Sequence, residues 1–142
     1  FENTYAIQNV LTGKALRPFD AHIENDVDII SYPLKNWECI TWEFIEIADN
    51  TYLLKDLFTE KTFQPKAEPK EDIGLWQKSL GGSTQQYWEF LKQTDGNFLI
   101  KLKGTEFYVT ANSDETNSPI ILSARRNDNR QLWRLIRQNP WI

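Results

Sequence analysis

Gln86-Tyr87-Trp88-Glu89-Phe90 is a short phrase that the chain repeats in variant form. It recurs earlier and later in the sequence, as Ile40-Thr41-Trp42-Glu43-Phe44 and as Gln131-Leu132-Trp133-Arg134-Leu135. The first two tryptophans are 46 residues apart and the last two are 45 apart, in a chain of 142 residues. A period of this length indicates a supersecondary unit that buries its apolar face only against its copies. The sequence therefore predicts one globule of three units with pseudo-threefold symmetry.

Each unit also has the same order of short apolar runs before its tryptophan. Opening strands are expected at 4–9, 51–56 and 97–102, and isoleucine-led strands at 29–32, 73–76 and 120–123. A second strand lies between them, so each unit is predicted to have four strands. Alternating and β-branched runs bounded by Gly, Pro, Asn and Asp outnumber helical patterns. We therefore predict one all-β domain over 1–142, with repeats at approximately 1–47, 48–92 and 93–142.

The tryptophan strands indicate which side chains form the core. Side chains two residues apart on a strand point the same way, so each tryptophan should face inward together with Phe44, Phe90 or Leu135. The residues between them should point outward. Polar loops at 18–28, 64–72 and 110–119 follow the second strand of each unit. We expect them at equivalent corners, where a rigid β scaffold tends to carry its binding residues.

Composition argues against several classes of partner and site. The net charge of −4 and a pI of about 5.0 argue against a nucleic-acid partner, which would need a surplus of Lys and Arg. Cys39 and His22 are each the only residue of their type, so we expect no disulfide, no metal and no cofactor, with Cys39 as a packed thiol. No apolar run approaches the ~20 residues of a membrane span. No signal peptide is visible, although secreted or cell-surface use is compatible with the sequence.

These repeats resemble the β-trefoil, and within it the ricin B-type lectin family, whose signature is Gln-x-Trp late in each repeat. Gln86-Tyr87-Trp88 and Gln131-Leu132-Trp133 match the signature, whereas the first copy has Ile40-Thr41-Trp42. The resemblance covers essentially the whole chain and implies a β-trefoil of three pseudo-symmetric repeats. It also implies a non-catalytic carbohydrate-binding lectin or module that binds glycans or glycoconjugates. It leaves open whether the chain acts as a homodimer or as part of a larger chain.

In the family, each sugar site combines three residues. They are an Asp after the second strand, an aromatic residue that ends the isoleucine-led strand, and an Asn or Gln before Gln-x-Trp. Carried over by position, the copies offer Arg17, Tyr32 and Cys39; Gln64, Trp76 and Gln85; and Thr110, in a register left open, with Ser123 and Arg130. No copy keeps the Asp, so the resemblance implies degenerate sites.

Two groups of residues retain the chemistry that sugar binding needs. An aromatic face covers the C–H patch of a pyranose, and amides or carboxylates bond its hydroxyls. The first group is Trp76 with Gln77, Gln85 and Gln64; the second is Tyr32 with Asn36, Trp37 and Asp20. Each aromatic residue also has a purely structural interpretation. Trp76 would then be a half-buried strand residue, and Trp37 a loop residue folded over the barrel mouth.

Other functions find less support in the sequence. Nothing resembles a nucleophile elbow, and the paired carboxylates Glu68 and Glu71 lie in a polar loop, so we do not expect an enzyme. The alternative function is a β-trefoil protease inhibitor that acts through an exposed loop. Its candidate loops are Leu16-Arg17-Pro18 and Arg125-Arg126.

Overall fold

The computed structural model describes residues 3–142, and these residues form twelve strands in three sets of four. The first set is β1 (Thr4–Asn9), β2 (Lys14–Pro18), β3 (Ile29–Pro33) and β4 (Trp42–Ala48). The second is β5 (Thr51–Asp56), β6 (Thr62–Pro65), β7 (Leu75–Lys78) and β8 (Trp88–Lys92). The third is β9 (Phe98–Leu102), β10 (Tyr108–Ala111), β11 (Ile120–Ser123) and β12 (Trp133–Arg137).

The described residues also form four short 3-10 helices. One precedes the tryptophan strand of each unit: η2 (Glu38–Ile40), η3 (Thr84–Gln86) and η4 (Asn129–Gln131). A further one, η1 (Phe19–Ala21), follows β2. The prediction of an all-β chain with three units of four strands is therefore confirmed.

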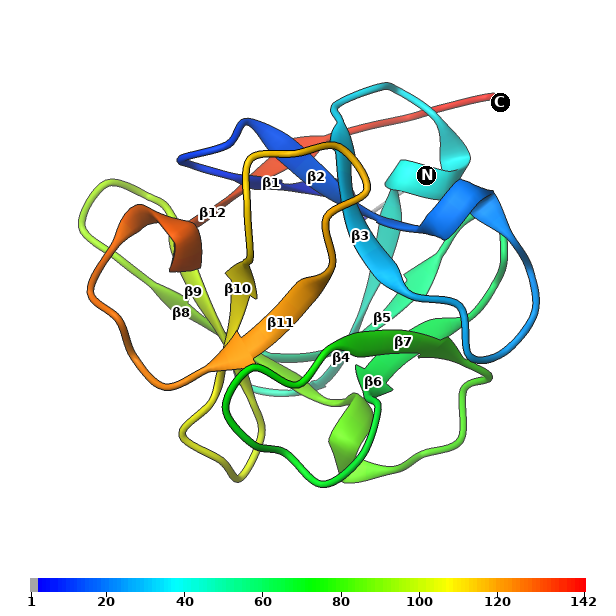
Figure 1. The fold of residues 1–142 in the computed structure, drawn as a ribbon. Helices are drawn as coiled ribbons and strands as arrows, with labels where there is room; N and C mark the ends of the chain where they lie inside the picture. The colour runs from blue at the N-terminus through cyan, green and yellow to red at the C-terminus, as the bar shows by residue number, and fades with distance from the viewer. Residues whose placement is uncertain (1–2) are drawn as a thin grey trace.

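The first and last strands of the units close a six-stranded barrel. Antiparallel pairing runs from β1 to β4, β5, β8, β9 and β12, and β12 returns to β1. Closure leaves none of these six strands with an unpaired edge. The remaining strands form three hairpins, β2–β3, β6–β7 and β10–β11. A closed barrel capped by three hairpins is the predicted β-trefoil (Figure 1).

The three hairpins join one another through a cyclic set of backbone hydrogen bonds. The Gln77 amide donates to the carbonyl of Val27 at 2.7 Å, and the Leu122 amide to that of Ile73 at 2.8 Å. The Ser31 amide closes the ring by donating to Ser118 at 2.9 Å. Each hairpin loop thus bonds the third strand of another unit, and β3, β7 and β11 surround the centre of this cap in Figure 1. The predicted equivalence of the three polar loops is confirmed.

The repeated tryptophans form the centre of the core. Trp42, Trp88 and Trp133 are all 0% exposed, which confirms their predicted burial. The Nε1 of Trp42 donates to the Leu16 carbonyl at 3.2 Å, and that of Trp133 donates to the Val109 carbonyl at 3.0 Å. Each bond ties a barrel strand to the second strand of its own unit. In the first and third units these hydrogen bonds therefore help to fix where the hairpin leaves the barrel.

Candidate functional site

The pairing within each hairpin defines which residues occupy equivalent places in the three units. Arg17 pairs with Ile30, Gln64 with Trp76, and Thr110 with Ile121. The second-strand residues of these pairs are Arg17, Gln64 and Thr110, the three that the family resemblance placed at the Asp position. The structure thus fixes the register of Thr110.

Two glutamine side chains hold these positions in the same manner. Gln86 Nε2 donates to Gln64 Oε1 at 2.9 Å, and Gln131 Nε2 donates to Thr110 Oγ1 at 3.1 Å. Both donors are the first residue of a Gln-x-Trp phrase, and both are buried. In the first unit that place is taken by Ile40, which cannot donate from its side chain. Arg17 is consequently free to bond elsewhere.

In the second unit, the residue equivalent to Tyr32 is not the one that the sequence suggested. Ser31, Gln77 and Leu122 make the same cyclic hydrogen bond, so the residues after them, Tyr32, Lys78 and Ser123, are equivalent. The placement of Trp76 in the same position as Tyr32 is therefore wrong. The isoleucine in the second unit stands 15 residues before its tryptophan rather than 13, so β7 begins at Leu75 instead of Ile73.

In the first unit, Arg17 connects the retained aromatic residue to a carboxylate. Its guanidinium carbon lies 4.0 Å from the centroid of the Tyr32 ring, and its Nη2 lies 3.5 Å from Asp20 Oδ1. The Arg17 side chain is 7% exposed, whereas that of Asp20 is 68% exposed. Asp20 has φ 54° and ψ 22°, a left-handed conformation that Asp tolerates better than most residues. The Asp20 carboxylate is thus bound at the surface by the same guanidinium that contacts the Tyr32 ring.

A second aromatic ring extends this surface. The Trp37 and Tyr32 ring centroids are 6.1 Å apart with an interplanar angle of 37°. Both residues are half-buried and pack on the small apolar cluster around Cys39 and Ile40. Asn36 is exposed in the loop immediately before Trp37. The structure therefore brings Tyr32, Trp37 and, through Arg17, Asp20 together; we call Arg17, Asp20, Tyr32 and Trp37 the first-unit cluster.

In the second unit, Trp76 lies on the outer face of the hairpin with Lys78. The Lys78 Nζ is 4.7 Å from the centroid of the Trp76 ring and forms an ion pair with Asp26 at 2.5 Å. The lysine thus lies against the indole that a sugar would need for stacking. Gln64 is directly across from Trp76 and half-buried, and Gln85 is half-buried in η3.

Gln77 points to the opposite face of the same strand. It is 0% exposed, and its Nε2 donates to the carbonyls of His22 at 2.9 Å and Glu24 at 2.7 Å. Its side chain holds the 19–28 loop and does not reach the surface shared by Gln64 and Trp76. The structure therefore does not bring Gln77 together with the other predicted residues of that unit.

In the third unit, side chains from another unit cover the equivalent surface. Ser123 Oγ donates to Glu71 Oε2 at 2.7 Å, and the Ala124 amide donates to Glu71 Oε1 at 2.9 Å. These two hydrogen bonds lower the pKa of Glu71, with Arg126 nearby adding to the effect. Because Ser123 has no ring and its hydroxyl is already bonded, the position equivalent to Tyr32 offers no stacking surface in this unit.

The solved structures that resemble the chain include a designed protein and a lectin. The designed 3-fold symmetric protein ThreeFoil matches with a TM-score of 0.91 at 19% identity, over 96% of this chain and 99% of its own. The ricin B-like lectin of Macrolepiota procera, solved in complex with lactose, matches with a TM-score of 0.80 at 18% identity, over 94% of both chains. The chain has the β-trefoil fold. Neither a family model nor a curated protein sequence matches it.

The same fold also occurs within a longer protein. The exo-β-1,3-galactanase 1,3Gal43A of Clostridium thermocellum matches with a TM-score of 0.87 at 20% identity. The match covers 96% of this chain but only 30% of the galactanase.

Three further findings concern the cysteine, metal binding and membrane-spanning helices. Cys39 is 9% exposed, and burial raises the pKa of its thiol, as expected for a packed side chain. Within residues 3–142, no group of three or more His, Cys, Asp or Glu side chains could hold a metal ion. No helix in the described part of the chain is both long and apolar enough to cross a bilayer.

One of the two predicted inhibitory loops is not a loop. Leu16, Arg17 and Pro18 are buried residues of β2, so the expectation that they form an exposed loop is wrong. Arg125 and Arg126 are exposed. Arg126 forms ion pairs with Glu71 at 3.5 Å and with Asp72 at 3.3 Å.

Sequence reasoning also missed two contacts between a cation and an aromatic ring in this β-trefoil, those of Arg17 and Lys78. Arg17 was regarded as a departure from the family Asp and as part of a candidate inhibitory loop, and Lys78 was not considered. Strand alternation gave a usable signal for Lys78, because it places Lys78 on the face of Trp76 and Gln77 on the other face. No comparable signal existed for Arg17, whose contact with Tyr32 depends on the hairpin register.

Proposed function

We propose that the chain acts as one non-catalytic, carbohydrate-binding β-trefoil domain, residues 1–142, and that the first-unit cluster is its principal site. The observation that carries the proposal is the contact of Arg17 with both the Tyr32 ring and the exposed Asp20 carboxylate. Asp20 thereby supplies the acceptor that the family Asp would have supplied from the position of Arg17. A carboxylate and a guanidinium together offer both acceptors and donors to vicinal hydroxyl groups.

The two rings supply the apolar part of the site. Tyr32 and Trp37 are half-exposed and adjacent, so a pyranose can lay its C–H patch against them. The Arg17 guanidinium carbon lies 4.0 Å from the Tyr32 centroid, whereas Lys35 Nζ is 6.0 Å from the Trp37 centroid. We therefore propose Trp37 as the main stacking surface, with Asn36 at its edge. Trp76, Gln64 and Gln85 form a second, weaker proposed contact, because Lys78 lies against the indole.

A glycan array with the protein displayed multivalently tests this proposal, since a single shallow site is expected to bind at roughly millimolar affinity. Replacing Trp37 by Ala or Asp20 by Asn should each weaken binding about tenfold, a loss of about 1.4 kcal/mol. Asn is chosen because it tolerates the left-handed backbone at position 20. Isothermal titration with the best glycan gives the affinities.

Matched variants separate the possible outcomes. Trp141→Ala removes an indole that is 89% exposed outside the cluster and should leave binding unchanged. Trp76→Ala should reduce the array signal only in part. If Trp76→Ala abolishes binding while Trp37→Ala and Asp20→Asn do not, the first-unit assignment is wrong. A wild-type protein that binds no glycan but inhibits trypsin would instead support the protease-inhibitor alternative through Arg125-Arg126.

A further inference from the structure

A hollow of about 270 Å³ opens at one end of the barrel. Tyr5 and Tyr52 line it from the starts of β1 and β5. The hairpins follow the far ends of those two strands, so the hollow is at the opposite end of the barrel from the hairpin cap. It therefore shares no residue with the first-unit cluster or with the Trp76 surface.

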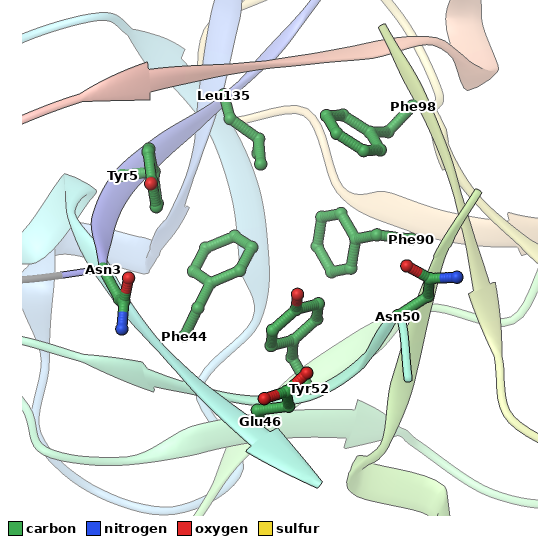
Figure 2. Close-up of a pocket in the computed structure, with 9 residues that line it drawn as sticks. All are labelled: Asn3, Tyr5, Phe44, Glu46, Asn50, Tyr52, Phe90, Phe98 and Leu135. Atoms are coloured by element: carbon green, nitrogen blue, oxygen red, sulfur yellow. The ribbon is translucent and has the colours of Figure 1, made fainter. Parts of the chain in front are cut away.

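Each unit contributes two apolar side chains to this hollow, one from its first strand and one from its last. They are Tyr5 and Phe44, Tyr52 and Phe90, and Phe98 and Leu135. Figure 2 shows the rings of Phe44, Phe90 and Tyr52 pointing toward one another from different strands, with Leu135 entering from the β12 side. Pseudo-threefold symmetry thus gathers aromatic rings around a single axis.

The rings stand at steep angles to one another and do not collapse into a stack. The Phe44 and Phe90 centroids are 5.0 Å apart at 54°, and the Tyr52 and Phe90 centroids are 5.7 Å apart at 83°. Phe98 meets Phe90 at 5.9 Å and 71°. Rings at such angles can present π faces, which carry partial negative charge, to an occupant of the hollow.

One carboxylate lies at the rim of the hollow. Glu46 lines it together with the amides of Asn3 and Asn50, and Figure 2 shows the carboxylate beside Tyr52. Among residues 3–142, Glu46 takes part in none of the ion pairs. The guanidinium of Arg137 lies 5.9 Å from the Tyr5 ring, but Arg137 does not line the hollow. Among residues 3–142, the lining therefore combines aromatic faces with one anionic group and no cation.

We propose that this hollow binds a methylated ammonium group, such as the trimethylammonium head of a choline-like ligand. A cation within about 6 Å of several ring centroids is attracted by their quadrupoles, and its methyl groups bury against the same rings. Glu46 supplies the counter-charge at the rim. A neutral apolar ligand of the same shape would fill the hollow without using the carboxylate.

Titration with two isosteric probes, choline and 3,3-dimethylbutan-1-ol, tests the proposal in the full chain. The two differ only in the charged nitrogen, which is a carbon in the alcohol. Followed by ¹H–¹⁵N NMR, choline should shift the amides of β1, β4, β5 and β8 around the hollow and should bind about tenfold more tightly than the alcohol. Equal affinities for both probes, or no saturable shift with choline, would overturn the proposal.

Two variants with the same change of charge examine the role of Glu46. Glu46→Gln should weaken choline binding about fivefold and leave the alcohol unaffected. Glu43→Gln, on the same strand but outside the hollow, should change neither. Phe98→Leu, which copies the side chain of Leu135, should weaken choline more than the alcohol because it removes a ring and keeps an apolar wall. If both Gln variants weaken choline equally, Glu46 is not the recognition group and the proposal fails.

Discussion

Replacing Trp88 by Ala is expected to lower the free energy of unfolding by about 3–5 kcal/mol, the largest effect of any substitution considered for this chain. Trp88 is 0% exposed and its ring lies 5.1 Å from that of Phe63. Within residues 3–142 its Nε1 has no hydrogen-bond partner, unlike those of Trp42 and Trp133. The loss should therefore come from packing and from the cavity left behind, with no contribution from a broken hydrogen bond.

Thermal and urea unfolding measure this effect. For a chain of this size, the loss corresponds to a fall in Tm of about 10–20 °C. Trp141→Ala is the matched control: it removes an indole that is 89% exposed and should change the stability by less than about 0.5 kcal/mol. A melting curve of Trp88→Ala that coincides with the wild-type curve would show that the indoles do not form the core.

Replacing Asp56 by Asn is expected to raise the stability at neutral pH by about 1–3 kcal/mol. Asp56 is 0% exposed at the end of β5; its Oδ1 accepts from the Phe58 and Thr59 amides, but its Oδ2 has no partner among the described residues. Burial raises the pKa of Asp56 well above its ordinary value, although those two amides act in the opposite direction. An ionised carboxylate is thus poorly accommodated there.

The first unit shows what an amide achieves at the equivalent place. Asn9 ends β1, and its Oδ1 accepts from the Leu11 and Thr12 amides, as Oδ1 of Asp56 does in its own unit. Its Nδ2 also donates to three carbonyls between Asn129 and Leu132, at 3.0–3.3 Å. Pseudo-symmetry places the carbonyls of residues 38–41 in the same relation to position 56. The side-chain amide of an asparagine at that position could donate to them, whereas a carboxylate cannot.

The raised pKa of Asp56 determines how the stability gained by Asp56→Asn changes with pH. Below the unfolded pKa of about 3.9, Asp56 is protonated in both states and the variant gains least. As the pH rises above that value toward the raised folded pKa, the unfolded state ionises first and the wild type loses stability. The advantage of Asp56→Asn should therefore grow from pH 4 upward. Denaturant unfolding across pH 4–8 measures it, with the exposed Asp49→Asn as control; a variant less stable than wild type at pH 7 would contradict the account.

The fold was predictable because the core repeats and tolerates little variation. Trp42, Trp88 and Trp133 must each fill the same buried space, so their spacing in the sequence reports the architecture directly. The shift of β7 was harder to foresee. Two extra residues before Trp88 moved the isoleucine of that unit out of register, and only the cyclic backbone hydrogen bonds show which residues are equivalent.

The candidate site was less predictable because surface positions carry no such constraint. The resemblance pointed to Tyr32, the chemistry of the neighbouring loop added Trp37, and the structure brings the two rings together. It could not show that Arg17, which stands in place of the family Asp, turns toward Tyr32 and holds Asp20. That contact depends on the β2–β3 register and on the left-handed backbone at position 20, neither of which residue spacing encodes.

The most direct test of the proposed sugar site is an NMR titration of the six tryptophan indole N–H signals with the best glycan from the array. The account predicts a saturable shift of the Trp37 signal, at most a small shift of Trp76, and unchanged signals for the buried Trp42, Trp88 and Trp133. A shift confined to Trp76, or none at Trp37 while the glycan binds, would contradict it.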